Sequence, residues 1–299
     1  MSAILRTIDL EKRFGGTKVL NRLNLEVPDG SVYALIGPNG AGKTTTIKIL
    51  MNILRPTAGS AEVFGADSRH LSALDFTRIG YVSENQDMPE WMTVEYFLAY
   101  LKPFYPTWDD ARAEELLRQF DLPRGRKLRH LSRGMRMKAA LASSLAYRPR
   151  LMVLDEPFTG LDPLMRDEFI QGLLQNAEGL TILISSHDLT EIESFASHIG
   201  YLDSGRLQFS EEMSSLTERF REIEITLETS PELPANWPAN WFKPESSAMV
   251  VRFVETRFNQ EETFAEVHRL FGPVLNISAA PMPLRTIFVT LAKAGRKSG

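Results

Sequence analysis

The fold of this chain is decided by the stretch Val32-Tyr-Ala-Leu-Ile-Gly-Pro-Asn-Gly-Ala-Gly-Lys-Thr44. Residues 32–36 form an apolar run of strand length, and the pattern G-x-x-x-x-G-K-[ST] begins directly after it, at Gly37. Residues 44–54 then carry apolar side chains at helical spacing until Pro56. A strand, a glycine-rich loop and a helix in this order are typical of a phosphate-binding loop, in which backbone N–H groups and the helix N-terminus point at the anion.

The side chains of this loop suit a phosphate ligand that carries a metal ion. The ammonium of Lys43 adds positive charge, and the hydroxyl of Thr44 can reach Mg²⁺. The residues predicted to hold the phosphates are Gly37, Pro38, Asn39, Gly40, Ala41, Gly42, Lys43, Thr44 and Thr45.

A pair of carboxylates follows a second apolar run. Residues 151–154 read Leu-Met-Val-Leu and deliver Asp155 and Glu156 to the end of a predicted strand. An Asp at this place can hold the Mg²⁺ shell, and a Glu beside it can take a proton from water that attacks a γ-phosphate. Such a pair is common at strand ends that meet solvent, and it is the phosphate loop upstream that favours the catalytic interpretation.

The chain alternates between strands and helices, which indicates an α/β class. Residues 151–154 and 181–185 are strand-length apolar or β-branched runs, with a helical stretch over residues 163–176 between them. Parallel buried strands with helical crossovers explain this order. From about residue 88 to 147 the pattern is helical, with proline breaks, and predicts an inserted helical subdomain.

A second, smaller unit is predicted after a hairpin-like segment over residues 199–209. We place the boundary after Met213, giving domains 1–213 and 214–299, the latter a small α+β domain. The expected elements are strands at 221–228, 249–255 and 274–279, a helix at 261–271 and a closing helix at 284–293; residues 231–244 are a proline-rich patch.

Composition excludes several classes of function. The 299 residues contain no cysteine, which excludes disulfide scaffolds, cysteine-ligated zinc and a thiol nucleophile. The formal net charge is −4, with 34 Lys+Arg and 38 Asp+Glu, so no large basic field for nucleic acid is expected. The N-terminus lacks a signal-peptide core and no run is long enough to cross a bilayer, so we expect a cytoplasmic chain.

Five further motifs occur in a fixed order: Phe14, Gln86, Leu131-Ser-Arg-Gly-Met135, Gly160-Leu-Asp162 and His187. Over about residues 3–210 this order makes the chain resemble the ATP-binding subunits of ABC (ATP-binding cassette) transporters. The resemblance implies that Phe14 stands at the family's adenine-stacking position, Gln86 in its Gln loop, residues 131–135 where the signature is L-S-G-G-Q, residues 160–162 as its D-loop and His187 as its switch histidine. Each of these residues has an ordinary structural interpretation when taken alone, and their order and spacing carry the resemblance.

The resemblance implies a P-loop NTPase fold of the ABC ATPase kind, with a mixed sheet, and a role for each motif. Gln86 would contact Mg²⁺ together with Thr44 and Asp155, and would reach the attacking water. Glu156 would be the general base, helped by His187, Gln86 and Lys43. Ser132, Gly134 and Asp162 would face the nucleotide of a partner cassette.

The signature departs from the common pattern at two positions, since Arg133 replaces a glycine and Met135 a glutamine. Because Ser132 and Gly134 are kept, we expect hydrolysis to survive. The sequence further predicts that Arg133 points beside the nucleotide.

The same resemblance implies partners. Two cassettes, identical or different, would sandwich two ATP molecules, and separate membrane-spanning permease subunits would hold the chain at the inner face of the cell membrane. The apolar segment around Trp91 is either core filling or part of a groove for a permease helix. The tail resembles extensions of drug and natural-product export subunits, which favours an exporter.

Three other functions use some of the same motifs. A soluble ABC ATPase acting on ribosomes or DNA would usually carry two cassettes or a long coiled coil, and neither is present. A small-molecule kinase has no use for the Ser132 segment, the D-loop and His187 together. A regulatory ATPase that binds without hydrolysing fits the same motifs, and only kinetics separates it.

Overall fold

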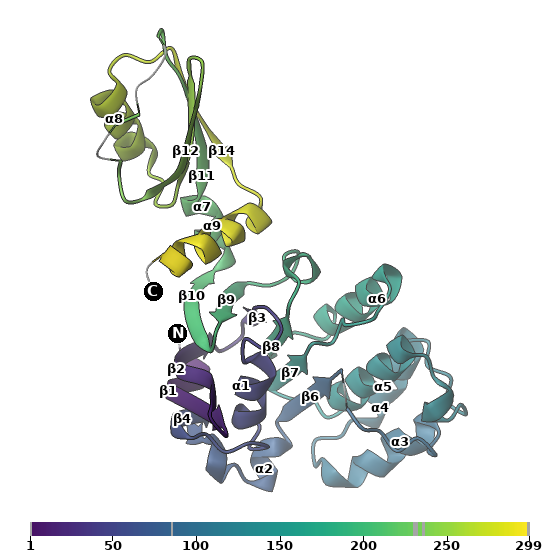
Figure 1. Cartoon of the computed structure of the whole chain (residues 1–299). Coiled ribbons are helices and arrows are strands. Elements are labelled where there is room, and N and C mark those ends of the chain that lie inside the picture. Colours follow the sequence, from purple (N-terminus) through teal and green to yellow (C-terminus); the bar gives the residue numbers. More distant parts are fainter. Residues whose placement is uncertain (1, 85, 230–232, 235–236, 298–299) are drawn as a thin grey trace. The chain divides into compact units, whose positions relative to one another are not determined.

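The computed structural model describes residues 2–84, 86–229, 233–234 and 237–297. It divides into two compact units, Met1–Ser210 and Glu211–Gly299, and each has its own hydrophobic core (Figure 1). Within the described ranges, no helix combines the length and apolar character needed to cross a membrane.

A six-stranded sheet forms the centre of the first unit. Its strands, in sheet order, are β10 (Arg206–Glu212), β9 (His198–Asp203), β3 (Val32–Ile36), β8 (Thr181–Ser186), β7 (Leu151–Asp155) and β6 (Ile79–Ser83). The pairs β9–β3, β3–β8, β8–β7 and β7–β6 are all parallel. The carboxyl ends of β3, β6, β7 and β8 therefore meet at one edge, and the loops that follow them begin side by side.

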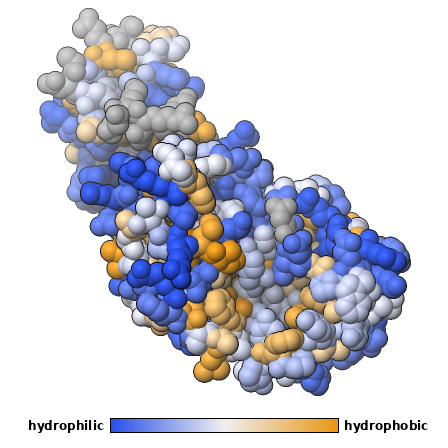
Figure 2. All heavy atoms as spheres, turned by 60° about the horizontal axis from the view of Figure 1, so that its bottom comes forward, coloured by the Kyte–Doolittle hydropathy of each residue, from blue (hydrophilic) through white to orange (hydrophobic). Residues whose placement is uncertain are grey.

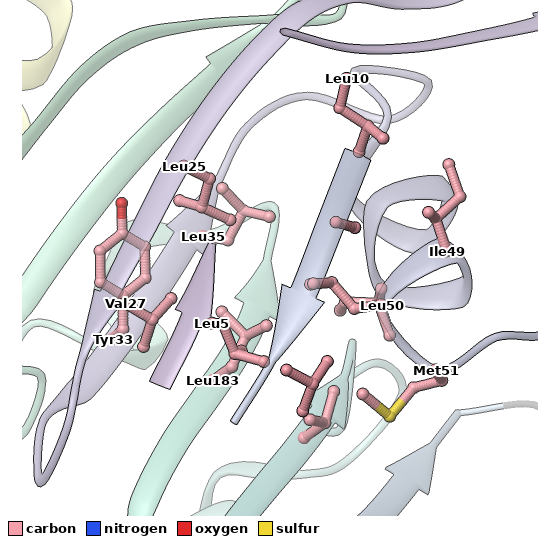
Figure 3. Packing of buried hydrophobic residues seen from close by; sticks show 14 of the residues in the cluster. Leu5, Leu10, Leu25, Val27, Tyr33, Leu35, Ile49, Leu50, Met51 and Leu183 are labelled. Atoms are coloured by element: carbon pink, nitrogen blue, oxygen red, sulfur yellow. The ribbon is translucent and has the colours of Figure 1, made fainter. Parts of the chain in front are cut away.

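A second sheet packs against the same core. Its strands, in sheet order, are β2 (Thr17–Pro28), β1 (Ala3–Phe14), β4 (Ala58–Val63) and β5 (Ala66–Asp67), all paired antiparallel. Helix α1 (Lys43–Leu50) shares this core through Ile49 and Leu50. Figure 3 shows Leu25 of the second sheet near Leu35 of the central sheet, and Leu5 near Leu183. Burial of α1 fixes the position of the loop that precedes it.

Helices connect the strands of the central sheet. Between β6 and β7 lie α3 (Val94–Leu101), α4 (Asp110–Gln119) and α5 (Arg133–Leu145), and α5 packs on both β6 and α4. The short α2 (Ala73–Phe76) precedes β6, and α6 (Pro163–Leu174) connects β7 to β8. Helix α6 begins with Asp162 as its cap and a proline in its first turn, which suits the missing proline N–H.

The second unit is a four-stranded antiparallel sheet with helices. Its strands, in sheet order, are β12 (Trp241–Ser247), β13 (Val250–Glu255), β11 (Arg221–Thr226) and β14 (Asn276–Pro281), and its helices are α7 (Met213–Arg219), α8 (Gln260–Phe271) and α9 (Leu284–Lys297). Its core combines aliphatic side chains with aromatic rings, and Trp241 stacks on Phe253 with centroids 4.0 Å apart. Successive side chains of β11 point to opposite faces of the sheet, and Ile223 and Ile225 lie on the buried face.

Strand β12 corrects the prediction for the proline-rich patch at 231–244, where no strand was expected. Pro244 is accommodated because β12 is an edge strand and its register breaks between Phe242 and Glu245. Residues 231, 232, 235 and 236 of the patch lie outside the described residues.

Candidate functional site

The loop between β3 and α1 has a backbone that only glycine can form at several points. Gly40 and Gly42 have φ angles of 81° and 111°, in the region that L side chains avoid. A Cβ on Gly37 would lie 2.1 Å from the carbonyl oxygen of Leu202, and one on Gly42 would lie 2.5 Å from Leu20. The glycine spacing therefore follows from close packing against neighbouring strands as well as from the turn itself.

Lys43 is the first residue of α1, and its side chain turns back over the loop. Its ammonium donates to the carbonyl oxygens of Gly37 at 2.6 Å and Pro38 at 3.2 Å, and lies 3.0 Å from Oε1 of Glu156. The side chain is only 5% exposed. A buried, fully paired cation thus stands at the mouth of the phosphate loop.

Asp155 ends β7 inside the site. Its Oδ1 accepts hydrogen bonds from the hydroxyls of Thr44 at 3.0 Å and Ser185 at 2.7 Å. Burial raises the pKa of the Asp155 carboxyl, and the two hydroxyl hydrogen bonds partly oppose this shift. These contacts join the first turn of α1 to the ends of β7 and β8.

Glu156 follows directly and turns its carboxylate toward the phosphate loop. Its φ angle is 51°, and its backbone N–H donates to Oγ of Ser185 at 3.0 Å. Its Oε2 lies 2.8 Å from Nδ1 of His187, and this hydrogen bond raises the pKa of the imidazole. The carboxylate therefore lies between the ammonium of Lys43 and the imidazole of His187.

A cavity of about 160 Å³ opens beside these groups. Its lining includes Thr44, Asp155 and Glu156 together with Glu84 and Gln86 from the loop after β6. Oε1 of Gln86 is buried and has no hydrogen-bond partner among the described residues. The backbone N–H of Glu84 donates to the carbonyl oxygen of Asp155 at 3.1 Å, which ties this loop to the end of β7.

Phe14 stands apart from this cluster, at the end of β1. Its ring is 47% exposed, and the Lys12 ammonium lies 4.9 Å from the ring centroid. Among the described residues, no hydrogen bond joins the backbone or side chain of Phe14 to Lys43, Asp155 or Glu156. The exposed ring offers a flat face for stacking.

The segment around Ser132 begins α5. Ser132 caps the helix, and its Oγ accepts the backbone N–H of Met135 at 3.2 Å. Gly134 is buried against Met165 of α6, where a Cβ would lie 2.4 Å from the Met165 side chain. Asp162 caps α6 and accepts the N–H of Met165 at 3.0 Å. The starts of α5 and α6 are therefore packed together, and no ion pair in the described ranges joins them to Lys43.

Arg133 does not project freely from this segment. Its Nη2 lies 2.5 Å from Oε1 of Glu84 in its own chain, and its guanidinium covers Gly160. The expectation that Arg133 points beside a nucleotide did not foresee this partner, because Glu84 is distant in sequence.

Comparison with known proteins decides the family. The family model "ABC transporter" matches residues 20–159. The bacitracin transport ATP-binding protein BcrA of Enterococcus faecalis is 33% identical over 226 residues, which cover 74% of this chain and 73% of that protein. The lantibiotic transport ATP-binding protein SrtF of Streptococcus pyogenes is 34% identical over 224 residues, covering 74% of this chain and 95% of SrtF.

The chain belongs to the ABC transporter family. Its fold agrees, because a solved structure of an ATP-binding subunit of an ABC transporter superposes with a TM-score of 0.65 and 29% identity, covering 72% of this chain and 92% of that one. The predicted family, the α/β P-loop fold and the function as an ATP-binding, ATP-hydrolysing transporter subunit are thereby confirmed.

Two residues of this ABC ATPase site are not predicted from the sequence. Ser185 belongs to an apolar strand, and Glu84 lies two residues before Gln86, which the resemblance singled out. No local pattern marks Ser185, since its importance comes from the pairing of β8 with β7. For Glu84, the available signal was its place directly after a strand that ends at the same edge as β7.

Proposed function

We propose that this chain hydrolyses ATP between two cassettes and that this reaction drives a separate permease. We further propose that the transporter exports a natural product. The observation that carries the proposal is the meeting of Lys43, Thr44, Asp155, Glu156 and His187, which come from three different loops, at one edge of the central sheet. Lys43 is the candidate for balancing phosphate charge, Thr44 and Asp155 are the candidates for the metal shell, and Glu156 is the candidate general base.

The residues present fit a Mg²⁺ ion that arrives with the nucleotide. Thr44 and Asp155 offer hard oxygen atoms, and the buried, unpartnered Oε1 of Gln86 lies on the same cavity. Clusters of three or more His, Cys, Asp or Glu suited to a metal are absent from the described part of the chain. Bound there, Mg²⁺ would neutralise developing charge on the phosphates.

The chain's own residues perform the proton transfer and positioning. Glu156 accepts a proton from the attacking water, since its carboxylate lies between Lys43 and His187 at the cavity. Lys43 moves from the loop carbonyls and Glu156 onto the β- and γ-phosphates, which are stronger partners for an ammonium. His187 contacts the γ-phosphate and Gln86 orients the water.

The remaining predicted residues serve the nucleotide from two chains. Phe14 stacks its exposed ring on adenine. Ser132 and Gly134, at the start of α5, offer a hydroxyl and backbone N–H groups to the γ-phosphate bound by a second copy of the chain. Asp162 crosses the interface between the copies. Closing and reopening of the two cassettes is the movement that drives the permease.

A permease helix fits an apolar groove next to the loop after β6. The groove, of about 440 Å³, is lined mainly by aromatic and aliphatic side chains, among them Phe76, Phe97, Tyr100 and Tyr105, together with a few polar ones such as Asp87. Trp91 is 61% exposed nearby in sequence. Figure 2 looks toward the side on which α2 and α3 lie in Figure 1, and hydrophobic residues gather there in several patches. Such a surface suits a short cytoplasmic helix and would hold the chain at the inner face of the membrane.

Export of a natural product is favoured by the names of the relatives, which are transport ATP-binding proteins for bacitracin and for a lantibiotic. The cargo itself would be recognised by the permease. The N-terminal unit carries every residue assigned above, and the C-terminal unit has an accessory role.

The test is steady-state hydrolysis of MgATP by the purified full chain, beside Glu156→Gln and the control Glu178→Gln, an exposed glutamate of the same unit. We expect Glu156→Gln to lower kcat at least about 100-fold while MgATP binding is kept, and Glu178→Gln to match the wild type. Equal rates for Glu156→Gln and the wild type would refute the assignment. Co-purification of a multi-span protein with tagged Glu156→Gln chain from its host tests the transporter role.

A further inference from the structure

Arg133 joins three loops of the ATP-binding unit that are far apart in sequence. It is the first residue of α5, directly after Ser132. Its guanidinium donates to Glu84 in the loop after β6, at 2.5 Å. The same group lies against Gly160 in the loop after β7.

The contact with Gly160 depends on that residue being glycine. Its φ is +72°, and a Cβ there would lie 3.2 Å from both Cζ and Nη1 of Arg133 and 3.3 Å from Nε. The planar guanidinium therefore packs directly against the face of Gly160 that carries no side chain. A larger residue at position 160 would strain the backbone and crowd the Arg133 guanidinium, which would have to shift by a few tenths of an ångström.

The contact with Glu84 connects Arg133 to the catalytic carboxylates. Glu84 lines the same cavity as Thr44, Asp155 and Glu156, and its N–H is bonded to the carbonyl oxygen of Asp155. Arg133 directs the Glu84 carboxylate to α5. Without the positive charge of Arg133, the Glu84 carboxylate would be free to turn toward Asp155 and Glu156. Repulsion among three neighbouring carboxylates would then make ionisation of each less favourable.

We propose that Arg133 is a positioning residue for ATP hydrolysis: through Glu84 and Gly160 it makes the start of α5, the loop after β6 and the loop after β7 move as one body. This inference rests on the proposed function, because it assigns a consequence to the rate of that reaction. The pair is 42% and 26% exposed, so it adds little to folding stability and its effect lies in geometry.

The kinetic test uses a double-mutant cycle in the full chain. Arg133→Ala and Glu84→Gln should each lower kcat about 5- to 30-fold with the KM for ATP changed less than about twofold, and the double variant should lose no more than either single one. The exchanged pair Arg133→Glu with Glu84→Arg should recover part of the rate. Arg136→Ala, an exposed arginine one turn further along α5, is the matched control and should keep the wild-type rate.

A second measurement works without turnover. Hydrogen exchange of the backbone amides in residues 79–90 and 155–162 should be faster in Arg133→Ala than in the wild type, and unchanged in Arg136→Ala. Independent, multiplicative losses of kcat together with unchanged exchange would overturn the link. A wild-type chain that binds but does not hydrolyse MgATP would instead refute the proposed function, and the exchange result would still decide the link.

Discussion

Nδ1 of His187 lies 2.8 Å from Oε2 of Glu156, and this one hydrogen bond joins the loop after β8 to the loop after β7. Since the opposite oxygen of Glu156 faces Lys43 at 3.0 Å, the carboxylate is held from both sides. The candidate general base of this ABC ATPase is thus fixed by two groups that also suit the γ-phosphate.

The Glu156–His187 contact predicts a pH dependence. The hydrogen bond that the His187 ring donates to the Glu156 carboxylate raises the pKa of His187 above the usual 6.5. Burial opposes this shift, the charges of Glu156 and Glu191 add to it, and the charge of Lys43 lowers the pKa. The protonated pair therefore stabilises the fold fully below pH ~6.5 and loses this contribution as pH rises through the higher folded pKa.

NMR titration of the imidazole resonances measures this directly. We expect the His187 pKa to lie above 6.5 in the wild type and to fall in Glu156→Gln. An unchanged His187 pKa in Glu156→Gln would mean that the pair does not form in solution.

Asp155→Asn should stabilise the chain while damaging the site. Burial raises the pKa of the Asp155 carboxyl, so the folded state bears a cost that appears as pH rises above the unfolded pKa of ~3.9 and is complete once pH exceeds the higher folded pKa. Asparagine keeps an oxygen for Thr44 and Ser185 but carries no charge. Thermal unfolding at pH 7 without metal should therefore give a higher Tm for Asp155→Asn than for the wild type.

The control for this measurement is Asp167→Asn, at an exposed position of α6, which should leave Tm within about 1 °C. A lower Tm for Asp155→Asn would show that the negative charge is compensated in the folded chain. Loss of Mg²⁺-dependent nucleotide binding in the same variant would accompany the gain in stability.

Ser185→Ala should slow hydrolysis out of proportion to its effect on stability. Oγ of Ser185 donates to the Asp155 carboxylate and accepts the backbone N–H of Glu156. Its loss leaves that half-buried N–H without a partner, at a cost of up to about 1–3 kcal/mol, and frees the Asp155 carboxylate and the Glu156 backbone to shift. We expect kcat to fall more than about tenfold. The comparison is Thr181→Val on the same strand, where a buried hydroxyl bonds Asp29 and the N–H of Gly30.

Thr181→Val should destabilise the chain by a similar amount while kcat stays within about twofold of the wild type. If both variants slow turnover equally, the effect of Ser185 is one of general stability.

Phe14→Ala should weaken ATP binding with little effect on kcat. Loss of one aromatic face under adenine is worth about 1–2 kcal/mol, which corresponds to a rise of about 5- to 30-fold in the Kd for ATP. Phe14→Trp should keep the wild-type affinity. Ile8→Ala, a similarly exposed apolar residue on β1, is the control in a fluorescent-nucleotide titration. Equal affinity of Phe14→Ala and Ile8→Ala would remove Phe14 from the site.

Truncation after Met213 should leave ATP hydrolysis within about twofold of the full chain. The first compact unit ends at Ser210 and contains all the predicted site residues. SrtF supports this expectation, because 95% of its length is matched by 74% of this chain. A truncated chain that folds, judged by circular dichroism, but fails to hydrolyse ATP would give the C-terminal unit a part in the reaction.

The sequence predicted what is local and missed what depends on pairing between distant strands. Gly37 to Thr44 and the Asp155–Glu156 pair are contiguous patterns whose spacing has one physical explanation. Ser185 is a hydroxyl in an apolar strand, and only the β7–β8 register places it beside Asp155. The partner of Arg133 lies 49 residues away, and β12 was hidden because proline usually marks a break rather than an edge strand.

Sedimentation velocity of Glu156→Gln with and without MgATP measures whether ATP closes two copies of this chain. We expect a monomer without nucleotide and a dimer with it, and we expect that adding Ser132→Arg keeps ATP binding but abolishes the dimer. A chain that binds MgATP at saturation and still sediments as a monomer would show that ATP does not close two copies of it.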